Sequence, residues 1–211
     1  MRTLAILPVK RFELAKTRLG EQLGPAQRRR LAQAMVSDVL DALVATGGLD
    51  AVIVTNEPAV ASLARDRGAA VLADPAEAGQ SGAALVGIAH SIHNGYERAL
   101  LVPGDCPALA SADLRVLLDR VSAPPAVTIV ADRHGSGTNA LLLTPPDAIE
   151  PGFGPGSFER HRLRASEAGA SWHVEALPAL LLDVDTPEDL AALRLALAGR
   201  DRATSAVLAE L

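Results

Sequence analysis

The chain has 211 residues, a formal net charge of −5, 49% hydrophobic residues and only 2% aromatic ones. This length suits one domain with an aliphatic core, and the acidic balance without a long basic run argues against a nucleic-acid-binding surface. No apolar stretch reaches the roughly 20 residues of a membrane span, the N-terminal run is too short for a signal peptide, and the single cysteine, Cys106, excludes an internal disulfide and favours a cytoplasmic location.

The first half of the chain alternates short apolar runs with helical patterns. The run 4–7 predicts a buried strand, and apolar residues at four-residue spacing from Leu31 to Leu43 predict a helix over about Pro25 to Val44. Strands are expected next at 51–55, 70–73 and 99–102, and helices at 58–67, capped by Asn56, and at about 79–94.

The second half continues this alternation with more loops. A helix is expected at 111–121, followed by strands at 126–130 and 140–143 that flank a polar turn. A loop rich in Pro and Gly, 145–156, then leads into the next helix. The remaining predicted elements are a helix at 157–168, short strands at 173–175 and 180–182, and a helix at 187–197.

The element order predicts one α/β domain over residues 1–211, with a mainly parallel sheet and helices on both faces. In such sheets, ligands bind beyond the carboxyl ends of the strands. The segments that follow the predicted strands are therefore candidate site segments: 9–18, 105, 135–139 and 183–185.

A cationic loop follows the first predicted strand. Lys10, Lys16 and Arg18, together with Arg11, place four positive charges within nine residues, without the glycine pattern of a Rossmann or P-loop protein. Side-chain charge would therefore hold a phosphate here, although an exposed amphipathic turn is an equal alternative. The triplet 28–30 is interpreted as a solvated helix face.

Three aspartates follow predicted strands and could bind a hard cation. Asp105 lies in a Pro/Gly turn directly after the strand 99–102, where a turn aspartate is the alternative. Asp183 and Asp185 follow the run 180–182, and period-two spacing on a strand would place both on one face. Magnesium prefers such oxygen ligands. The residues after them, Thr186 onward, form a helix start that does not explain the two aspartates.

Two flexible polar loops are candidate anion sites. The first is 135–139, and the second, 152–157, leads into a helix whose free N–H groups suit an anion. An ordinary surface loop capped by Ser157 is the alternative. Cys106 has no activating motif and is expected to be buried, and His90 with His93 lacks a third metal ligand.

Five ordered motifs resemble the 2-phospho-L-lactate or phosphoenolpyruvate guanylyltransferases, which make an intermediate of the deazaflavin coenzyme F-420. The resemblance covers nearly the whole chain. The matching segments are 8–10 with 15–19, 103–107, 137–141, 153–158 and 182–190.

The resemblance implies a glycosyltransferase-A-like (Rossmann-like) nucleotidyltransferase fold, with GTP, a small phosphorylated carboxylic acid and Mg²⁺ as its ligands. By position, Asp105 and Asp185 would bind the metal, with Asp183 as a further candidate. The catalytic set would comprise Lys10, Lys16, Arg18 and Asp105, and the substrate-binding set Thr138, Asn139, Gly154, Ser157 and Ser81. At the helix start 79–85, many relatives in the wider fold carry a Leu-Asn pair that binds the base and that this chain lacks. The resemblance therefore constrains the nucleotide base less than it constrains the class of reaction.

Other interpretations stay open from the sequence. A related nucleotidyltransferase could use another donor or acceptor, as molybdopterin guanylyltransferases and sugar-acid cytidylyltransferases do, although the former carry a Gly-rich loop that is missing after the first strand. A non-catalytic nucleotide-binding regulator is the alternative from another class. The acceptor could be phosphoenolpyruvate or 2-phospho-L-lactate, and a homodimer is open as the assembly.

Overall fold

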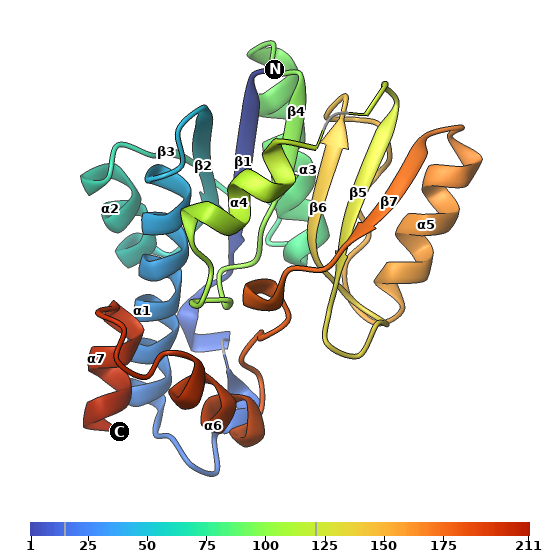
Figure 1. Ribbon diagram of the computed structural model, residues 1–211. Coiled ribbons are helices and arrows are strands. Elements are labelled where there is room, and N and C mark those ends of the chain that lie inside the picture. Colours follow the sequence, from blue (N-terminus) through green and yellow to red (C-terminus); the bar gives the residue numbers. More distant parts are fainter. Residues whose placement is uncertain (15, 121) are drawn as a thin grey trace.

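A computed structural model describes residues 1–14, 16–120 and 122–211 (Figure 1). Ala15, in the first motif of the resemblance, and Val121, at the predicted end of a helix, lie outside the described residues. The strands are β1 (Thr3–Val9), β2 (Leu49–Thr55), β3 (Ala70–Leu72), β4 (Arg98–Leu101), β5 (Ala126–Ala131), β6 (Thr138–Thr144) and β7 (Ser171–Glu175). The helices are α1 (Pro25–Val44), α2 (Pro58–Asp66), α3 (Gly79–His93), α4 (Ser111–Leu118), α5 (Ser157–Glu167), α6 (Pro187–Ala196) and α7 (Ala203–Glu210), with 3-10 turns η1 (Phe12–Leu14), η2 (Thr17–Leu19) and η3 (Pro178–Leu180).

The seven described strands form one sheet in the order β3-β2-β1-β4-β6-β5-β7. β1 pairs in parallel with β2 and β4, and β5 pairs in parallel with β7. Among the described strands β6 alone is antiparallel, to both β4 and β5. The prediction of a mainly parallel sheet is therefore confirmed, and the polar turn after β5 returns the chain into the same sheet.

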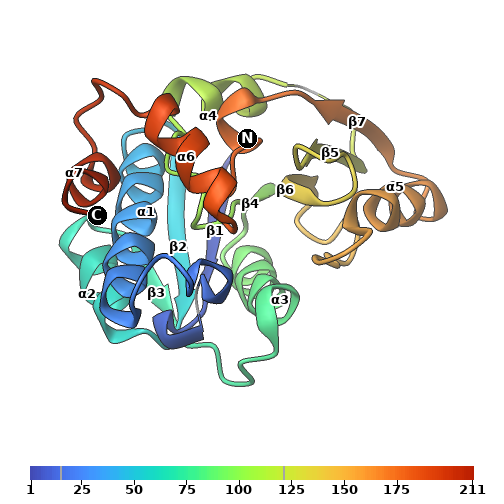
Figure 2. The same ribbon diagram turned by 90° about the horizontal axis from the view of Figure 1, so that it is seen from below.

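Helices cover both faces of the sheet, as the alternating side chains of β1 require (Figures 1 and 2). Leu7 and Val9 join the core cluster under α1, α2 and α4, whereas Leu4 and Ile6 join the cluster under α3 and α5. Gly87 lets α3 approach β1 closely, because a Cβ at this position would overlap Ile6. No helix in the described part of the chain has the length and apolar character to cross a membrane.

In the C-terminal region one prediction is wrong and one helix was missed. The run 180–182 is no strand: Pro178 lacks the N–H that a ladder needs, and η3 ends at Leu180 with its side chain in the core. Helix α7 was not predicted, because it depends on a distant residue. The buried carboxylate of Asp38 in α1 accepts the N–H groups of Ala203 and Thr204, at 2.9 Å each, and so fixes the start of α7.

Candidate functional site

The parallel pairing of β1 with β4 brings two predicted site segments together. The register places Ile6 beside Leu101, so the chain leaves both strands at the same edge of the sheet. Lys10 and Lys16 follow β1, and Asp105 follows β4. The expectation that these segments meet at the carboxyl edge is confirmed.

Lys16 joins the two aspartates predicted as metal ligands. Its Nζ donates to Asp105 Oδ2 at 2.6 Å and to Asp185 Oδ1 at 3.1 Å. The Lys16 side chain is only 7% exposed, and its backbone adopts a left-handed conformation with φ of 54°. The two carboxylates therefore converge on one buried positive charge.

Charge balance keeps this lysine protonated. Burial by itself lowers the pKa of Lys16, but the carboxylates of Asp105 and Asp185 outweigh burial and raise its pKa above the usual value of 10.5. Asp183 lies nearby without lining the cavity around Asp105. Burial, with Asp105 and Asp185 as further causes, raises the pKa of Asp183, although the hydrogen bond from Asn139 opposes this rise.

Asp183 contacts a different part of the sheet from its neighbour Asp185. Asn139 on β6 donates through Nδ2 to Asp183 Oδ1 at 3.2 Å and to the carbonyl of Leu180 at 2.5 Å. Within the described residues no group of three or more His, Cys, Asp or Glu is arranged to hold a metal ion. The role of Asp183 as a third metal ligand therefore stays a prediction. In the structure, Asn139 fixes the segment before α6 through its two hydrogen bonds.

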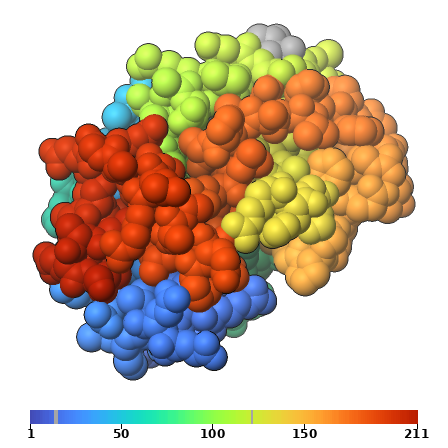
Figure 3. Space-filling model, turned by 60° about the horizontal axis from the view of Figure 1, so that its bottom comes forward, coloured from blue at the N-terminus to red at the C-terminus, as the bar shows by residue number. Residues whose placement is uncertain are grey.

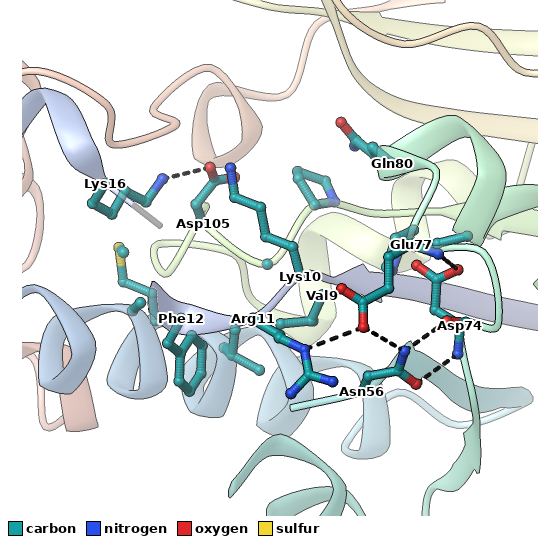
Figure 4. A pocket seen from close by; sticks show the side chains of 18 of the residues that line it. Val9, Lys10, Arg11, Phe12, Lys16, Asn56, Asp74, Glu77, Gln80 and Asp105 are labelled. Atoms are coloured by element: carbon teal, nitrogen blue, oxygen red, sulfur yellow. Dashed lines mark hydrogen bonds and ion pairs between the residues drawn. The ribbon is translucent and has the colours of Figure 1, made fainter. Parts of the chain in front are cut away.

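A cavity of about 440 Å³ extends from Asp105 and Asp185 along the carboxyl edge of the sheet (Figure 4). Lys10 and Arg11 diverge at the end of β1: Lys10 points toward Asp105 and Arg11 toward Glu77. The other polar residues that line the cavity include Lys16, Asn56, Asp74 and Gln80. The molecular surface is also hollowed between the orange-red segment that leads into α6 and the yellow turn after β5 (Figure 3).

A hydrogen-bonded network builds the end of the cavity away from Asp105. Asn56 Nδ2 donates to Glu77 Oε1 at 2.9 Å and to the carbonyl of Asp74 at 2.6 Å, and Arg11 Nε donates to the same Glu77 oxygen at 3.1 Å. The side-chain hydrogen bonds from Asn56 and then Arg11 lower the pKa of Glu77. Glu77 therefore presents an ionised, oriented carboxylate to the cavity.

This network corrects one expectation for Asn56. The helix α2 is capped by Glu57, whose side chain accepts the N–H of Ala59 at 3.4 Å, and Asn56 instead holds the segment after β3. Arg11 belongs to the cationic loop that the sequence singled out, whereas Asn56, Asp74 and Glu77 were not selected as site residues from the sequence. These three residues follow β2 and β3, and the rule that ligands bind beyond the carboxyl ends of the strands finds them when it is applied to β2 and β3 as well.

The residues predicted to bind the acceptor substrate cluster around the start of β6 and the loop before α5. Thr138, the first residue of β6, shares a hydrogen bond of 2.9 Å between its Oγ1 and His161 Nδ1, and His161 Nε2 accepts the N–H of Gly152 at 2.8 Å. The loop that follows needs left-handed glycines, with φ of 100° at Gly154 and 70° at Gly156. His161 was missed from the sequence, since a histidine inside an Arg-rich helix carries no motif.

The remaining predicted residues divide between these regions. Ser157 is buried as the first residue of α5, and Ser81 Oγ accepts the N–H of Phe153 at 2.9 Å, so α3 contacts the same loop. None of Ser81, Thr138, Asn139, Gly154 and Ser157 lines the cavity at Asp105. Arg18 is exposed on η2 and does not line the cavity either. Cys106 is fully buried and burial raises its pKa, which confirms a packing role.

Comparison with known proteins shows the family of this chain. Residues 3–211 match the model of a family described as guanylyl transferase, CofC like. The chain belongs to this family. A phosphoenolpyruvate guanylyltransferase from Conexibacter woesei is 50% identical over 202 residues, 95% of this chain and 91% of the relative. One from Sphaerobacter thermophilus is 39% identical over 193 residues, 90% of this chain and 91% of the relative.

Two solved structures share the fold of this chain. A protein described as a nucleotide-diphospho-sugar transferase from Desulfovibrio desulfuricans has a TM-score of 0.78 at 19% identity, covering 99% of this chain and 94% of that one. A nucleotidyl transferase from Methanothermobacter has a TM-score of 0.72 at 17% identity, covering 95% and 99%. These likenesses confirm the nucleotidyltransferase fold, and the family membership confirms the enzyme class.

Proposed function

We propose that the protein transfers GMP from GTP to phosphoenolpyruvate and releases pyrophosphate. The observation that carries this proposal is a single cavity with Lys16, Asp105 and Asp185 at one end and the Arg11–Glu77–Asn56 network at the other. Its volume of about 440 Å³ lies in the usual range for small-molecule sites. The relatives named as phosphoenolpyruvate guanylyltransferases support the choice of acceptor.

Glu77 supports GTP as the donor. Guanine presents two adjacent donors, N1–H and the 2-amino group, whereas adenine presents an acceptor at N1. An ionised carboxylate only accepts hydrogen bonds, so it matches guanine and opposes adenine. Glu77 is held through Oε1 by Arg11 and Asn56, and its second oxygen completes the acceptor pair that the base requires.

The chemistry of Asp105 and Asp185 fits the Mg²⁺ that we propose as cofactor. Both carboxylates reach one cation position, as their shared contact with Lys16 Nζ demonstrates. Two carboxylates, completed by phosphate oxygens and water, are a usual magnesium ligand set in phosphate-transferring enzymes. When bound there, Mg²⁺ would neutralise phosphate charge and polarise the α-phosphate.

The chain itself supplies orientation and charge. The phosphate of the acceptor has a second pKa near 6, so about neutral pH it is mostly a dianion and needs no general base. An oxygen of this phosphate attacks the α-phosphorus of GTP, the bond to the β-phosphate breaks, and pyrophosphate leaves. Lys10 and Lys16 reduce the repulsion between the two polyanions, while Thr138, Gly154 and Ser157 hold the acceptor.

Direct transfer also fits the state of Cys106. This thiol is buried and its pKa is raised, so it does not serve as a covalent nucleophile. We further propose that the product is an intermediate of coenzyme F-420 biosynthesis and that the protein acts in the cytoplasm, as the family resemblance implies.

Mass spectrometry of competing acceptors tests the proposed function. The enzyme is given GTP and Mg²⁺ with equal amounts of phosphoenolpyruvate and 2-phospho-L-lactate. The expected product is the GMP adduct of phosphoenolpyruvate, with one pyrophosphate per adduct. A dominant adduct of 2-phospho-L-lactate would make that acid the acceptor in place of phosphoenolpyruvate. Equal use of ATP, CTP and UTP would contradict GTP as the donor. Nucleotide binding without pyrophosphate release would indicate a non-catalytic regulator.

A further inference from the structure

His161 on α5 connects the two halves of the predicted acceptor site. Its side chain is fully buried. One ring nitrogen, Nε2, accepts the backbone N–H of Gly152, and the other, Nδ1, lies 2.9 Å from Thr138 Oγ1. Thr138 begins β6 and Gly152 begins the glycine loop, so one imidazole joins two segments that are separate in the sequence.

The hydrogen bonds determine which ring nitrogen carries the proton. A backbone N–H can only donate, so Nε2 must be bare to receive the one from Gly152. Burial, followed by the charges of Arg164 and Arg160, lowers the pKa of His161 to about 4, so the ring is neutral near pH 7. A neutral ring keeps one proton, which must then lie on Nδ1 and be donated to Thr138 Oγ1.

This tautomer determines the direction of the Thr138 hydroxyl. Because Oγ1 already accepts the proton of Nδ1, the hydrogen of the hydroxyl points away from the ring. A hydroxyl oriented in this way donates to an anion, and its oxygen is polarised by the bond that it accepts. With the opposite tautomer the hydroxyl would donate to the ring and would turn its lone pairs toward a ligand, which repels an anion.

The loop on the other side of His161 is braced from several directions. Arg160 donates to the carbonyl of Gly152 at 2.6 Å, and Arg164 donates to the carbonyl of Glu150 at 2.7 Å. The ring of Phe153 packs edge-on against His161, with centroids 5.4 Å apart. The backbone from Gly152 to Ser157 is therefore held against the same imidazole that orients Thr138.

We propose that His161 is a positioning residue for the acceptor anion: its Nδ1–H turns the Thr138 hydroxyl into a donor toward the acceptor, and its Nε2 fixes the start of the Gly152–Ser157 loop. This proposal rests on the proposed function for the identity of the anion and for its place beside Thr138. The tautomer follows from the contacts of the protein alone and is tested without substrate.

Nitrogen NMR of the whole protein, labelled with ¹⁵N-histidine, tests the tautomer. The chain has five histidines, and the resonances that disappear in His161→Gln identify the ring of interest. The expected spectrum at pH 7 shows a protonated Nδ1 and a bare Nε2 for His161. A proton on Nε2, or a doubly protonated ring, overturns the proposal whatever reaction the enzyme performs.

Two amide substitutions, each of which reproduces the position of one ring nitrogen, then separate the two contacts. In His161→Asn the amide nitrogen can replace Nδ1 and still donate to Thr138, but nothing reaches Gly152. In His161→Gln the amide oxygen can replace Nε2 and accept from Gly152, but Thr138 loses its donor. We expect each change to raise the KM for phosphoenolpyruvate by about 10- to 100-fold, as for a lost hydrogen bond near a charge, with the KM for GTP unchanged.

His93→Gln, at an exposed position of α3, is the matched control and should leave both KM values unchanged. Equal rises in both KM values, or a fall in kcat alone, would show that His161 only supports folding, and the proposal would be wrong. A wild-type enzyme that ignores phosphoenolpyruvate but joins GMP to another phosphorylated acid refutes the acceptor assignment. The His161 proposal is then tested on the KM for that acid.

Discussion

The ammonium of Lys16 lies 2.6 Å from a carboxylate oxygen of Asp105, and this contact ties the loop after β1 to the loop after β4. Asp185, about eighty residues further along the chain, contacts the same ammonium at 3.1 Å. A divalent cation on these carboxylates would use the oxygens that Lys16 occupies. Lysine and metal would therefore compete for the same two carboxylates until phosphates arrived to share the positive charge.

This competition predicts opposite effects of Lys16→Met on metal binding and on turnover. Without the ammonium, the two carboxylates repel each other, and we expect nucleotide-free protein to bind Mn²⁺ about tenfold more tightly or better. Turnover should fall by about 100-fold, because a charge that stabilises the phosphates is lost. Calorimetric titration and steady-state rates measure the two effects, with Arg65→Met on α2 as the control. An unchanged Mn²⁺ affinity would contradict the shared site.

Asp105→Asn and Asp185→Asn should each remove most of the turnover, and the double variant should lose little more, because both act through one assembly. Their stabilities should differ. Asp105→Asn weakens the nearer partner of a buried lysine and should lower the free energy of unfolding by about 1–3 kcal/mol. Asp185 is about half exposed, so Asp185→Asn should cost less.

Thr186→Ala is the matched comparison for Asp185. In the wild type, Oγ1 of Thr186 accepts the N–H of Asp189 at 3.3 Å as the N-cap of α6. Its loss should lower stability by about 1 kcal/mol and leave most of the turnover. Denaturant unfolding and magnesium-dependent rates separate the two classes. If Asp185→Asn behaves like Thr186→Ala, then Asp185 belongs only to the start of the helix.

Glu77→Gln should weaken the preference for GTP. The amide replaces an ionised acceptor pair with one acceptor and one donor, so the KM for GTP should rise by about 10- to 100-fold, while ATP should be tolerated better. For inosine triphosphate, which lacks the 2-amino group, the substitution should raise the KM less than it does for GTP. Glu13→Gln, an exposed acid in the same cationic loop, serves as control. Unchanged donor selectivity would move base recognition elsewhere in the cavity.

Stability should depend on pH through His161. The pKa of its ring is lowered from about 6.5 to about 4 in the folded protein, so between these values the unfolded chain binds more protons. The contribution is present in full above pH 6.5 and is lost as pH falls toward 4. From pH 7 to pH 5 the wild type should lose about 2 kcal/mol more than His161→Gln. Parallel loss in both proteins, measured by urea unfolding, would show that the folded ring titrates normally.

Local patterns in the sequence determined much of this protein. All seven described strands were predicted, six of them from short apolar runs, and the Thr186–Pro187 pair predicted the start of α6 with its cap. Lys10, Lys16 and Asp105 were found because each follows such a strand. These predictions succeed since strand alternation, caps and turns are interactions between near neighbours in the chain.

Tertiary structure alone decided which polar groups meet. Asp183 and Asp185 look equivalent in the sequence, but packing turns Asp183 to Asn139 and Asp185 to Lys16. Glu77 becomes a site residue only because β1, β2 and β3 are adjacent, and His161 only because α5, packed against β5 and β7, reaches the first residue of β6. A side chain's partner depends on the direction in which its backbone presents it, and for residues far apart in the chain only the packing of whole elements sets that direction.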